Sequence, residues 1–173
     1  MTKQVDQAFE PIIGETPRVL ILGSMPSQLS LASSQYYGNP NNAFWWIMGE
    51  VFGFDAQASY LQRCEALKGS GIAVWDVIER CHRPGSLDSD IDKASVQANN
   101  FAAFFASHPS ITSCLFNGQA SQKLFNQHMG KSFLEHLDIH SECLPSTSPA
   151  HASISRDQKF EVWKPVLQQT LAC

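Results

Sequence analysis

The sequence lacks a hydrophobic run of the roughly 20 residues that a membrane-spanning helix needs. Its first residues, MTKQVDQAFEPIIG, lack the apolar core of a secretory signal peptide. These two absences argue against a membrane protein and against an exported protein. We therefore expect a cytoplasmic protein with no membrane partner.

Paired cysteines are also absent. No two of the cysteines form the Cys-x-x-Cys pair that is typical of zinc ribbons and redox motifs. They are Cys64, Cys81, Cys114, Cys143 and Cys173. His136 and His140 lie four residues apart, but no third metal ligand accompanies them. The sequence therefore predicts no metal site and no disulfide framework.

An excess of positive charge is missing as well. The chain has 12 Lys and Arg against 16 Asp and Glu, a formal net charge of -4. Proteins that bind DNA tightly through its phosphates are usually basic, so a binder of that kind is not expected. A local cationic face is compatible with this total. Its candidate members are Lys123, Lys131, Arg156, Lys159 and Lys164.

Glycine-rich phosphate loops of the GxGxxG and Walker kinds are absent, which argues against a doubly wound nucleotide-binding enzyme. Internal repeats and linkers are absent too, so we expect residues 1–173 to form a single domain. With 43% apolar residues, the chain has enough material for a full core.

The sequence does contain an alternation of strand-like and helix-like segments. Short apolar runs predict strands at residues 18–23, 71–76, 111–116 and 137–144. Longer segments predict helices at 43–53, 58–68, 97–107, 119–128 and 160–171, the last disturbed near Pro165. Strands that alternate with helices predict an α/β fold with a mostly parallel sheet covered on both faces.

Polar segments follow the four predicted strands, at 23–27, Asp76, 117–118 and 145–151. Because parallel sheets bind ligands outside the carboxyl ends of their strands, we expect these segments to converge. Two of them, GSMPS and PSTSPAH, are rich in Ser and Pro. Short hydroxyls and loop amides of this kind can bind a phosphodiester without carrying charge.

Six segments in order, GSMPS, YYGNPNNAFW, GIAVWDV, GSLDSDI, FNG and LPSTSPAH, are similar to the motifs of a known family. The set resembles the uracil-DNA glycosylase superfamily, and within it the hypoxanthine-DNA (deoxyinosine) glycosylases. The resemblance implies a three-layer α/β/α sandwich around a four-stranded parallel sheet. It also implies a monofunctional base-excision repair enzyme that flips a deaminated base out of DNA and hydrolyses its N-glycosidic bond without a cofactor. The expected partner is DNA containing deaminated bases, and we expect a monomer.

The resemblance implies that Asn42 is catalytic and positions the attacking water. Asn42 falls where deoxyinosine glycosylases carry an Asn, whereas Met25 stands where many relatives carry an Asp or Asn. A thioether is a poor hydrogen-bond acceptor for that water. From the residues alone, Asn42 is instead the N-cap of the helix that follows. Asn39 is the second candidate for the water-directing role.

Asp76 occupies the position at which uracil-specific relatives recognise the base with an Asn. A carboxylate only accepts hydrogen bonds, so it suits the N1–H of hypoxanthine and repels the carbonyl oxygens of uracil. This difference places deoxyinosine ahead of uracil and xanthine as the substrate. The alternative is a strand-end Asp that caps the turn at residues 77–80.

Aromatic and polar side chains near these segments complete the candidate base pocket. Tyr37 and Phe44 are candidates for stacking on a flipped base. Met25 and Asn117, each at the exit of a predicted strand, are further base-binding candidates. The alternative for the aromatic residues is an ordinary place in the core.

Serines of the two loops are candidates for contacts with the DNA backbone. Ser24, Ser27 and Ser146 would bind phosphates on the two sides of the cavity. In relatives, the His or Asn of the second loop stabilises the leaving base, and Ser148 and His151 are the catalytic candidates here. His151 has two alternatives: it fills the gap that the flipped base leaves, or it is an ordinary exposed side chain.

A binding function without catalysis is the alternative from another class. An inactive member of the fold would recognise a nucleotide or a nucleic acid. Met25 and the acidic net charge favour this alternative, whereas Asn42, Asp76 and the Ser/Pro loop argue against it.

Overall fold

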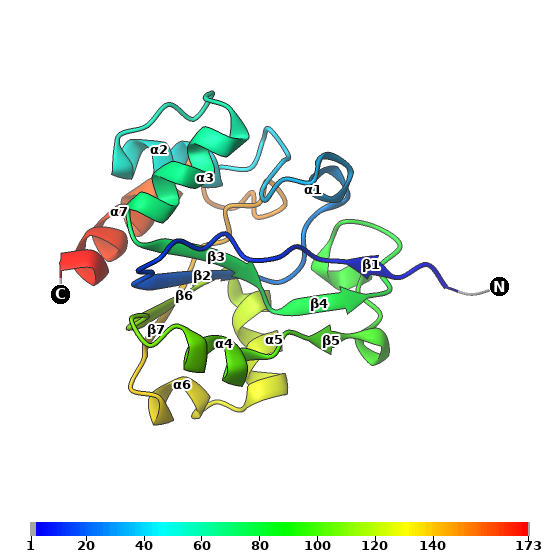
Figure 1. Ribbon diagram of the computed structural model, residues 1–173. Helices are drawn as coiled ribbons and strands as arrows, with labels where there is room; N and C mark the ends of the chain where they lie inside the picture. Colours follow the sequence, from blue (N-terminus) through cyan, green and yellow to red (C-terminus); the bar gives the residue numbers. More distant parts are fainter. Residues whose placement is uncertain (1–2, 173) are drawn as a thin grey trace.

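A four-stranded parallel sheet forms the centre of the computed structural model, which describes residues 3–172. Its strands lie in the order β3–β2–β6–β7 (Figure 1). They are β2 (Val19–Gly23), β3 (Ile72–Asp76), β6 (Ser113–Asn117) and β7 (His140–Leu144). The register pairs Gly23 with Asp76 and Asn117 with Leu144, so all four strands end at one edge.

The composition of the strands explains their positions in the sheet. Every residue of β2 and β6 is buried, as expected for central strands that are covered on both faces. β7 begins with exposed His140 and Ser141, which suits a strand at the edge of the sheet.

Helices cover both faces of this sheet (Figure 1). On one face lie α2 (Phe44–Phe52), α3 (Tyr60–Gly69) and α7 (Arg156–Ala172), whose buried residues pack with Ile21, Val74 and Leu115. On the other lie α4 (Phe101–Ser107), α5 (Gln119–Met129) and α6 (Phe133–His136), which pack with Leu20, Ala73 and Cys114. The predicted three-layer α/β/α sandwich around a four-stranded parallel sheet is confirmed.

A small antiparallel sheet, absent from the sequence prediction, extends from the end of β3. It consists of β1 (Asp6–Gln7), β4 (Ile78–Cys81) and β5 (Gln97–Ala98), in the order β1–β4–β5. Between β4 and β5 the chain forms two 3₁₀ turns, η1 (Asp88–Asp90) and η2 (Lys93–Ser95). The short helix α1 (Gln28–Ser33) follows β2. These elements surround the carboxyl edge of the main sheet.

Three predicted boundaries are wrong for local reasons. The helix predicted at 97–107 begins at Phe101, because residues 97–98 pair in β5 and Asn100 caps the helix by accepting from the Ala103 amide at 3.1 Å. The strand predicted at 137–144 begins at His140, because α6 and the turn after it extend to residue 138. The last helix begins four residues early, at Arg156, and continues through Pro165.

No helix within residues 3–172 is long and apolar enough to cross a membrane. Helix α7 begins after the loop that follows β7 and runs back along the sheet, so it ends far from the carboxyl edge (Figure 1).

Candidate active site

A cavity of about 1230 Å³ lies at the carboxyl edge of the parallel sheet. The segments after the four strands line it together: 23–27 after β2, Asp76 at the end of β3, 117–118 after β6 and 145–151 after β7. The expected convergence of these segments is therefore present. The volume is sufficient for a nucleobase with its sugar and for solvent.

Asp76 forms the floor of the cavity. The residue is 3% exposed, and its Oδ2 has no hydrogen-bond partner among the described residues. The pKa of this carboxyl group is raised to about 7, mainly by burial; the nearby charge of Asp88 adds to the shift, and that of Arg83 opposes it. The Asn99 side chain donates to the Asp76 backbone carbonyl at 2.8 Å and fixes the end of the strand. The carboxyl group thus changes its charge near neutral pH.

Gly23 provides the space for this carboxyl group. A Cβ atom on Gly23 would lie 2.6 Å from Asp76 Oδ1 and 3.1 Å from the hydroxyl oxygen of Tyr37. Any other residue would displace both groups, so the final Gly of the β2 strand is a steric requirement of the site. The same distances show that the carboxyl and the hydroxyl lie together over one backbone position.

Tyr37 lies beside Asp76 in an unusual backbone conformation. Its φ is +52°, in the left-handed region that non-glycine residues rarely adopt. The ring stacks on Phe44 with 4.0 Å between centroids and 27° between planes. Its hydroxyl makes no hydrogen bond of good geometry among the described residues; burial followed by the Asp76 charge raises its pKa above the usual range, and the nearby side-chain amide of Asn117 opposes this shift. The hydroxyl therefore keeps its proton at neutral pH.

Phe44 does not line the cavity. It is completely buried behind Tyr37, so any contribution of Phe44 to base stacking passes through the Tyr37 ring.

Asn42 occupies a position that suits both roles considered for it from the sequence. Its side-chain Oδ1 accepts a hydrogen bond from the Phe44 amide at 2.9 Å and so satisfies an amide in the first turn of α2, whose N-cap position is Ala43. The same side chain lines the cavity. The carboxamide oxygen keeps a second lone pair, so capping leaves an acceptor for a water molecule. Asn39 also lines the cavity, but its Oδ1 accepts from the Asn41 amide within its own turn.

Asn117 holds the loop at 145–151 in place. Its Oδ1 accepts from the Thr147 amide at 2.9 Å, and its Nδ2 donates to Thr147 Oγ1 at 3.0 Å. The Thr147 carbonyl in turn accepts from the Ala43 amide at 3.0 Å, next to Asn42. Asn117 lines the cavity as predicted, while both ends of its amide bind the loop. Sequence reasoning missed Thr147, because no pattern distinguishes it from the serines on either side.

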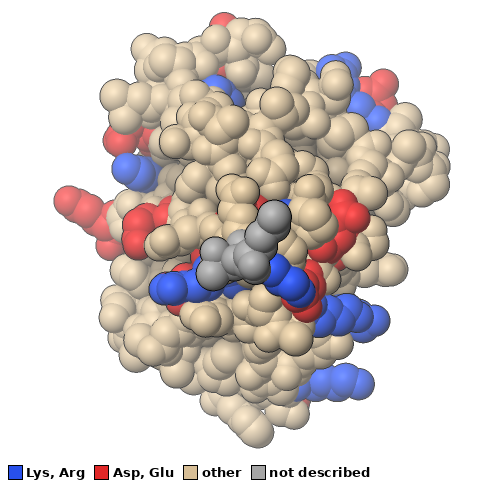
Figure 2. Space-filling view, turned by 90° about the vertical axis from the view of Figure 1, so that its right-hand side faces the viewer, with Lys and Arg blue, Asp and Glu red and all other residues tan. Residues whose placement is uncertain are grey.

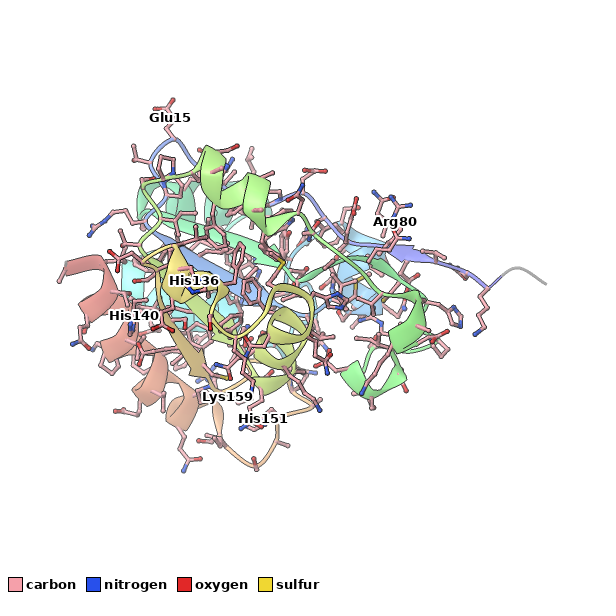
Figure 3. All side chains as sticks on the ribbon, turned by 90° about the horizontal axis from the view of Figure 1, so that it is seen from below. Glu15, Arg80, His136, His140, His151 and Lys159 are labelled. Carbon is pink, nitrogen blue, oxygen red and sulfur yellow. The ribbon has the colours of Figure 1, made fainter. Side chains whose placement is uncertain are left out.

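Helix α7 supports the same loop from behind. Lys159 donates from Nζ to the Ser148 carbonyl at 3.0 Å, and Trp163 donates from Nε1 to the Pro145 carbonyl at 2.9 Å. Figure 3 shows Lys159 on the helix beside His151 on the loop. Because Lys159 is 4% exposed, the prediction that it belongs to a cationic face is wrong. It fastens the loop instead.

The serines of the two loops differ in the protons they have left to donate. Ser146 Oγ accepts from the Ser148 amide at 3.2 Å, and Ser148 Oγ accepts from the Ala150 amide at 3.1 Å. Both hydroxyls therefore keep a proton for a phosphate or a base. Ser27 caps α1 by accepting from the Ser30 amide, and its own hydroxyl proton is donated to Ser30 Oγ at 3.2 Å.

The loop after β2 is held by residues that the sequence analysis did not consider. Ser24 donates its hydroxyl proton to Asp88 at 2.5 Å, so a contact between Ser24 and a phosphate would have to replace this bond. The buried Arg83 donates from Nη2 to the Pro26 carbonyl. Residues 86–88 thereby form one wall of the cavity, and the only sequence signal of this segment is the GSLDSDI motif.

The remaining predicted residues also lie at the cavity. Met25 is 8% exposed; it lines the cavity and packs into the core below, which suits an apolar contact. His151 lines the opposite wall, and its amide donates to the Ser148 carbonyl at 3.0 Å. Lys123 and Lys131 are exposed at the mouth. Arg156 lies over the Trp46 ring instead, 3.8 Å from its centroid.

Metal ligands do not gather in the part of the chain that the structure describes: no group of three or more His, Cys, Asp or Glu side chains converges there. His140 interacts with Glu142 at 3.2 Å. Cys173 lies outside the described residues.

The three-layer fold and the cavity at its carboxyl edge are those of the uracil-DNA glycosylases. Residues 11–170 match the model of the uracil DNA glycosylase superfamily, and the chain belongs to this superfamily.

Relatives within the superfamily include two proteins named hypoxanthine DNA glycosylase. The one from Methanosarcina barkeri is 40% identical over 116 residues, which are 66% of this chain and 72% of the relative. The one from Methanosarcina acetivorans is 31% identical over 165 residues, or 95% and 99% of the two chains. A solution NMR structure of a candidate uracil DNA glycosylase from Methanosarcina acetivorans has a TM-score of 0.81 and is 30% identical, covering 96% of this chain and 99% of its own.

Proposed function

We propose that hypoxanthine is the base that this chain, a DNA glycosylase of the base-excision repair type, releases from deoxyinosine in DNA. The observation that carries the proposal is the buried, unpartnered Asp76 carboxyl group at the floor of the cavity. Two relatives named hypoxanthine DNA glycosylase support the same substrate. The enzyme would act on a nucleotide flipped out of the duplex, because its glycosidic bond is inaccessible within the base stack.

Ionised Asp76 distinguishes hypoxanthine from the other deaminated bases. The N1–H of hypoxanthine lies between the C6 carbonyl and the C2–H, so a carboxylate can accept from N1–H while its second oxygen lies near C2–H. In uracil and in xanthine the corresponding N–H lies between two carbonyl groups, and one of them must face a carboxylate oxygen. This unfavourable contact would disfavour uracil and xanthine while Asp76 is ionised.

Asn42 would position the attacking water. The water oxygen forms a bond to C1′ of the sugar as the glycosidic bond breaks, and the electron pair of that bond leaves with the base. The water proton is released to the leaving base or to solvent. Because an amide is a weak base, Asn42 would act by holding the water in line with the breaking bond. Its cap bond to Phe44 fixes the carboxamide for this task.

The second loop would stabilise the leaving base and hold the DNA backbone. Ser148 and His151 line the wall next to the base position, and a hydroxyl or imidazole proton there would stabilise the charge on the leaving base. Ser146 would donate to a phosphate on one side. On the opposite side, Ser27 and Ser24 would do so only by giving up their bonds to Ser30 and Asp88. We also expect a monomer and one catalytic domain, since one chain supplies every wall of the cavity.

The test is cleavage of duplex oligonucleotides that carry one deoxyinosine, deoxyuridine or deoxyxanthosine, followed by alkali to break abasic sites. We expect strand breaks at deoxyinosine, and a loss of about 100-fold or more in the single-turnover rate of Asn42→Ala. Thermal unfolding of the variant serves as the control for its cap role. A lower unfolding midpoint with unchanged activity per folded molecule would mean that Asn42 only caps the helix. If the wild type forms abasic sites on none of the duplexes, an inactive binding protein is favoured instead.

A further inference from the structure

We propose that the Tyr37 hydroxyl is a specificity determinant that donates a hydrogen bond to the C6 carbonyl of hypoxanthine while Asp76 accepts from N1–H. This inference rests on the proposed function, because it assigns a second contact to the same base. It adds a donor to a pocket in which the sequence gives Tyr37 only a stacking role.

The first observation is that both groups lack partners. Tyr37 Oη and Asp76 Oδ2 are two of the four buried side-chain atoms without a hydrogen bond among the described residues. A buried polar atom without a partner costs free energy, so such atoms are rare in folded proteins. Arg83 accounts for the other two, and it does not line the cavity. Tyr37 Oη and Asp76 Oδ2, one a donor and one an acceptor, belong to residues that line the cavity.

The second observation is their mutual position. Both groups lie over Gly23, where a single added Cβ would be 2.6 Å from Asp76 Oδ1 and 3.1 Å from Tyr37 Oη. Hypoxanthine presents an acceptor at O6 directly beside a donor at N1. Adenine presents the reverse order, a donor at the 6-amino group beside an acceptor at N1. A hydroxyl donor and a carboxylate acceptor held side by side therefore match the hydrogen-bonding edge of hypoxanthine and mismatch that of adenine.

The third observation is the strained backbone that presents the hydroxyl. Tyr37 has a φ of +52°, and its neighbours hold it there: Gly38 donates from its amide to Ser30 Oγ at 2.9 Å, and Tyr36 donates to Tyr60 Oη at 3.0 Å. The left-handed backbone conformation is unfavourable for a tyrosine, and backbone strain of this kind is concentrated at functional sites. Stacking on Phe44 then fixes the ring plane. The hydroxyl is held in place before any base binds.

Tyr37→Phe tests the proposal because it keeps the ring and removes only the hydroxyl. We expect the single-turnover rate on deoxyinosine duplex to fall about 10-fold to 100-fold, since O6 would enter the pocket without a donor. The thermal midpoint should stay the same or rise, because the hydroxyl has no partner to lose. Binding of a duplex carrying deoxynebularine, whose base lacks both O6 and the N1 proton, should be equal for the two proteins.

Thr170→Val is the control, because it also removes one buried hydroxyl. Thr170 donates to the Val166 carbonyl of its own helix and does not line the cavity, so the substitution should lower the midpoint by about 2–4 °C and leave the rate per folded molecule unchanged. A Tyr37→Phe rate within about threefold of the wild type would overturn the proposal while leaving the hypoxanthine glycosylase intact. If the wild type itself releases no hypoxanthine, the proposed function fails first and this contact fails with it.

Discussion

The surroundings of the Asp76 carboxyl group are unfavourable for its charged form. It is almost completely buried, and one of its oxygens has no hydrogen-bond partner among the described residues. Burying a charge without a partner is unfavourable, so the group holds its proton to a pH of about 7. A fold that needed only a helix cap or a turn at this strand end would use a smaller or more exposed polar residue. The cost is consistent with a group kept for recognition.

The pH dependence of stability should report this carboxyl group. Its pKa is raised from 3.8 to about 7 in the folded state, so between these values the folded chain binds more protons than the unfolded chain. Stability from Asp76 is therefore fully present below the unfolded pKa and is lost as pH rises through the folded pKa. Relative to Asp76→Asn, the free energy of unfolding of the wild type should fall by about 3 kcal/mol between about pH 5 and about pH 8.

Urea unfolding of both proteins at the two pH values is the measurement. The Asn variant is nearly isosteric and does not titrate, so it removes the contribution of all other groups. Parallel curves for the two proteins would contradict the raised pKa.

The preference for hypoxanthine over uracil should also depend on pH. Protonated Asp76 can donate as well as accept, and in that form it tolerates a carbonyl group of uracil. As pH rises through about 7 the group ionises, and uracil should be rejected more strongly. We expect the ratio of single-turnover rates on deoxyinosine and deoxyuridine to increase over this range in the wild type. In Asp76→Asn the ratio should be low and flat.

A ratio is the useful quantity here because pH effects on shared steps cancel in it. A constant ratio in the wild type, with the two rates changing together, would mean that Asp76 does not contact the part of the base that differs between the substrates.

The sequence predicted which residues lie at the cavity better than it predicted the residues that they contact. Asp76 is recognisable because it ends a strand, and Asn42 because it precedes a helix. Both residues line the cavity. The bond from Ser24 to Asp88 joins residues 64 positions apart, and no periodicity predicts it. Phe44 illustrates the same limit, because only the packing shows that Tyr37 stands between it and the cavity.

The loop between β7 and α7 owes its shape to three other elements. Asn117 at the end of β6 binds both the amide and the hydroxyl of Thr147, the segment before α2 donates to it, and α7 holds it through Lys159 and Trp163. A loop held on three sides loses little conformational entropy when it binds DNA. This arrangement lets an irregular segment hold Ser146 and Ser148 at fixed positions.

Thr147→Val should weaken this brace without changing the size of the side chain. Asn117 Nδ2 would lose its acceptor in a buried position, so we expect a decrease of about 1–3 kcal/mol in the free energy of unfolding and a slower release of hypoxanthine. Thr170→Val, in α7 and bonded to the Val166 carbonyl of its own helix, is the control. Equal stabilities for the two variants would show that the Asn117 bond does not support the loop.

Elements of sufficient length were predictable, and short ones were not. The strand at 19–23 and the helix at 44–52 have strong apolar patterns, and both were predicted within two residues of their bounds. The antiparallel sheet contains strands of only two to four residues, which are too short to show alternation. The helix expected at 97–107 lost its first turn to this sheet, because tertiary pairing at 97–98 prevailed over helix propensity.

The face of the molecule at the carboxyl edge of the main sheet has few positively charged side chains. Figure 2 shows the side to which the strands point, with blue and red side chains interspersed over a mostly uncharged surface. Of the five cations considered from the sequence, Lys159 is buried, and Arg156 and Lys164 lie over the rings of Trp46 and Phe160 and do not line the cavity. This leaves Lys123 and Lys131 at its mouth. Recognition would thus depend on hydroxyls, loop amides and the base pocket more than on charge.

DNA binding should therefore have a weak salt dependence. With about two phosphates neutralised by Lys123 and Lys131, the slope of log affinity against log salt concentration should be about -2 for a duplex with an abasic-site analogue. Lys123→Ala and Lys131→Ala should each reduce the slope by about 1. Titrations at several salt concentrations measure it, and a slope steeper than about -5 would reveal a cationic surface elsewhere.

The global architecture followed from the sequence because it depends on repetition. Four buried strands separated by helices permit few arrangements, and a parallel sheet brings every strand exit to one edge. No comparable rule of strand order predicted that the segment at residues 83–90 would lie beside the cavity. Its place depends on the buried Arg83, whose neighbours come from segments distant in the sequence.

The path of α7 has a practical consequence for handling the protein. The helix starts next to the loop at 145–151 and ends at the opposite end of the molecule, while the N-terminal strand β1 lies on the cavity side (Figure 1). A biotin tag, a fluorescent fusion or a surface attachment placed after α7 should leave the DNA-facing side accessible. The same addition before β1 would crowd it, so immobilised single-molecule and surface-binding assays should use the C-terminal end.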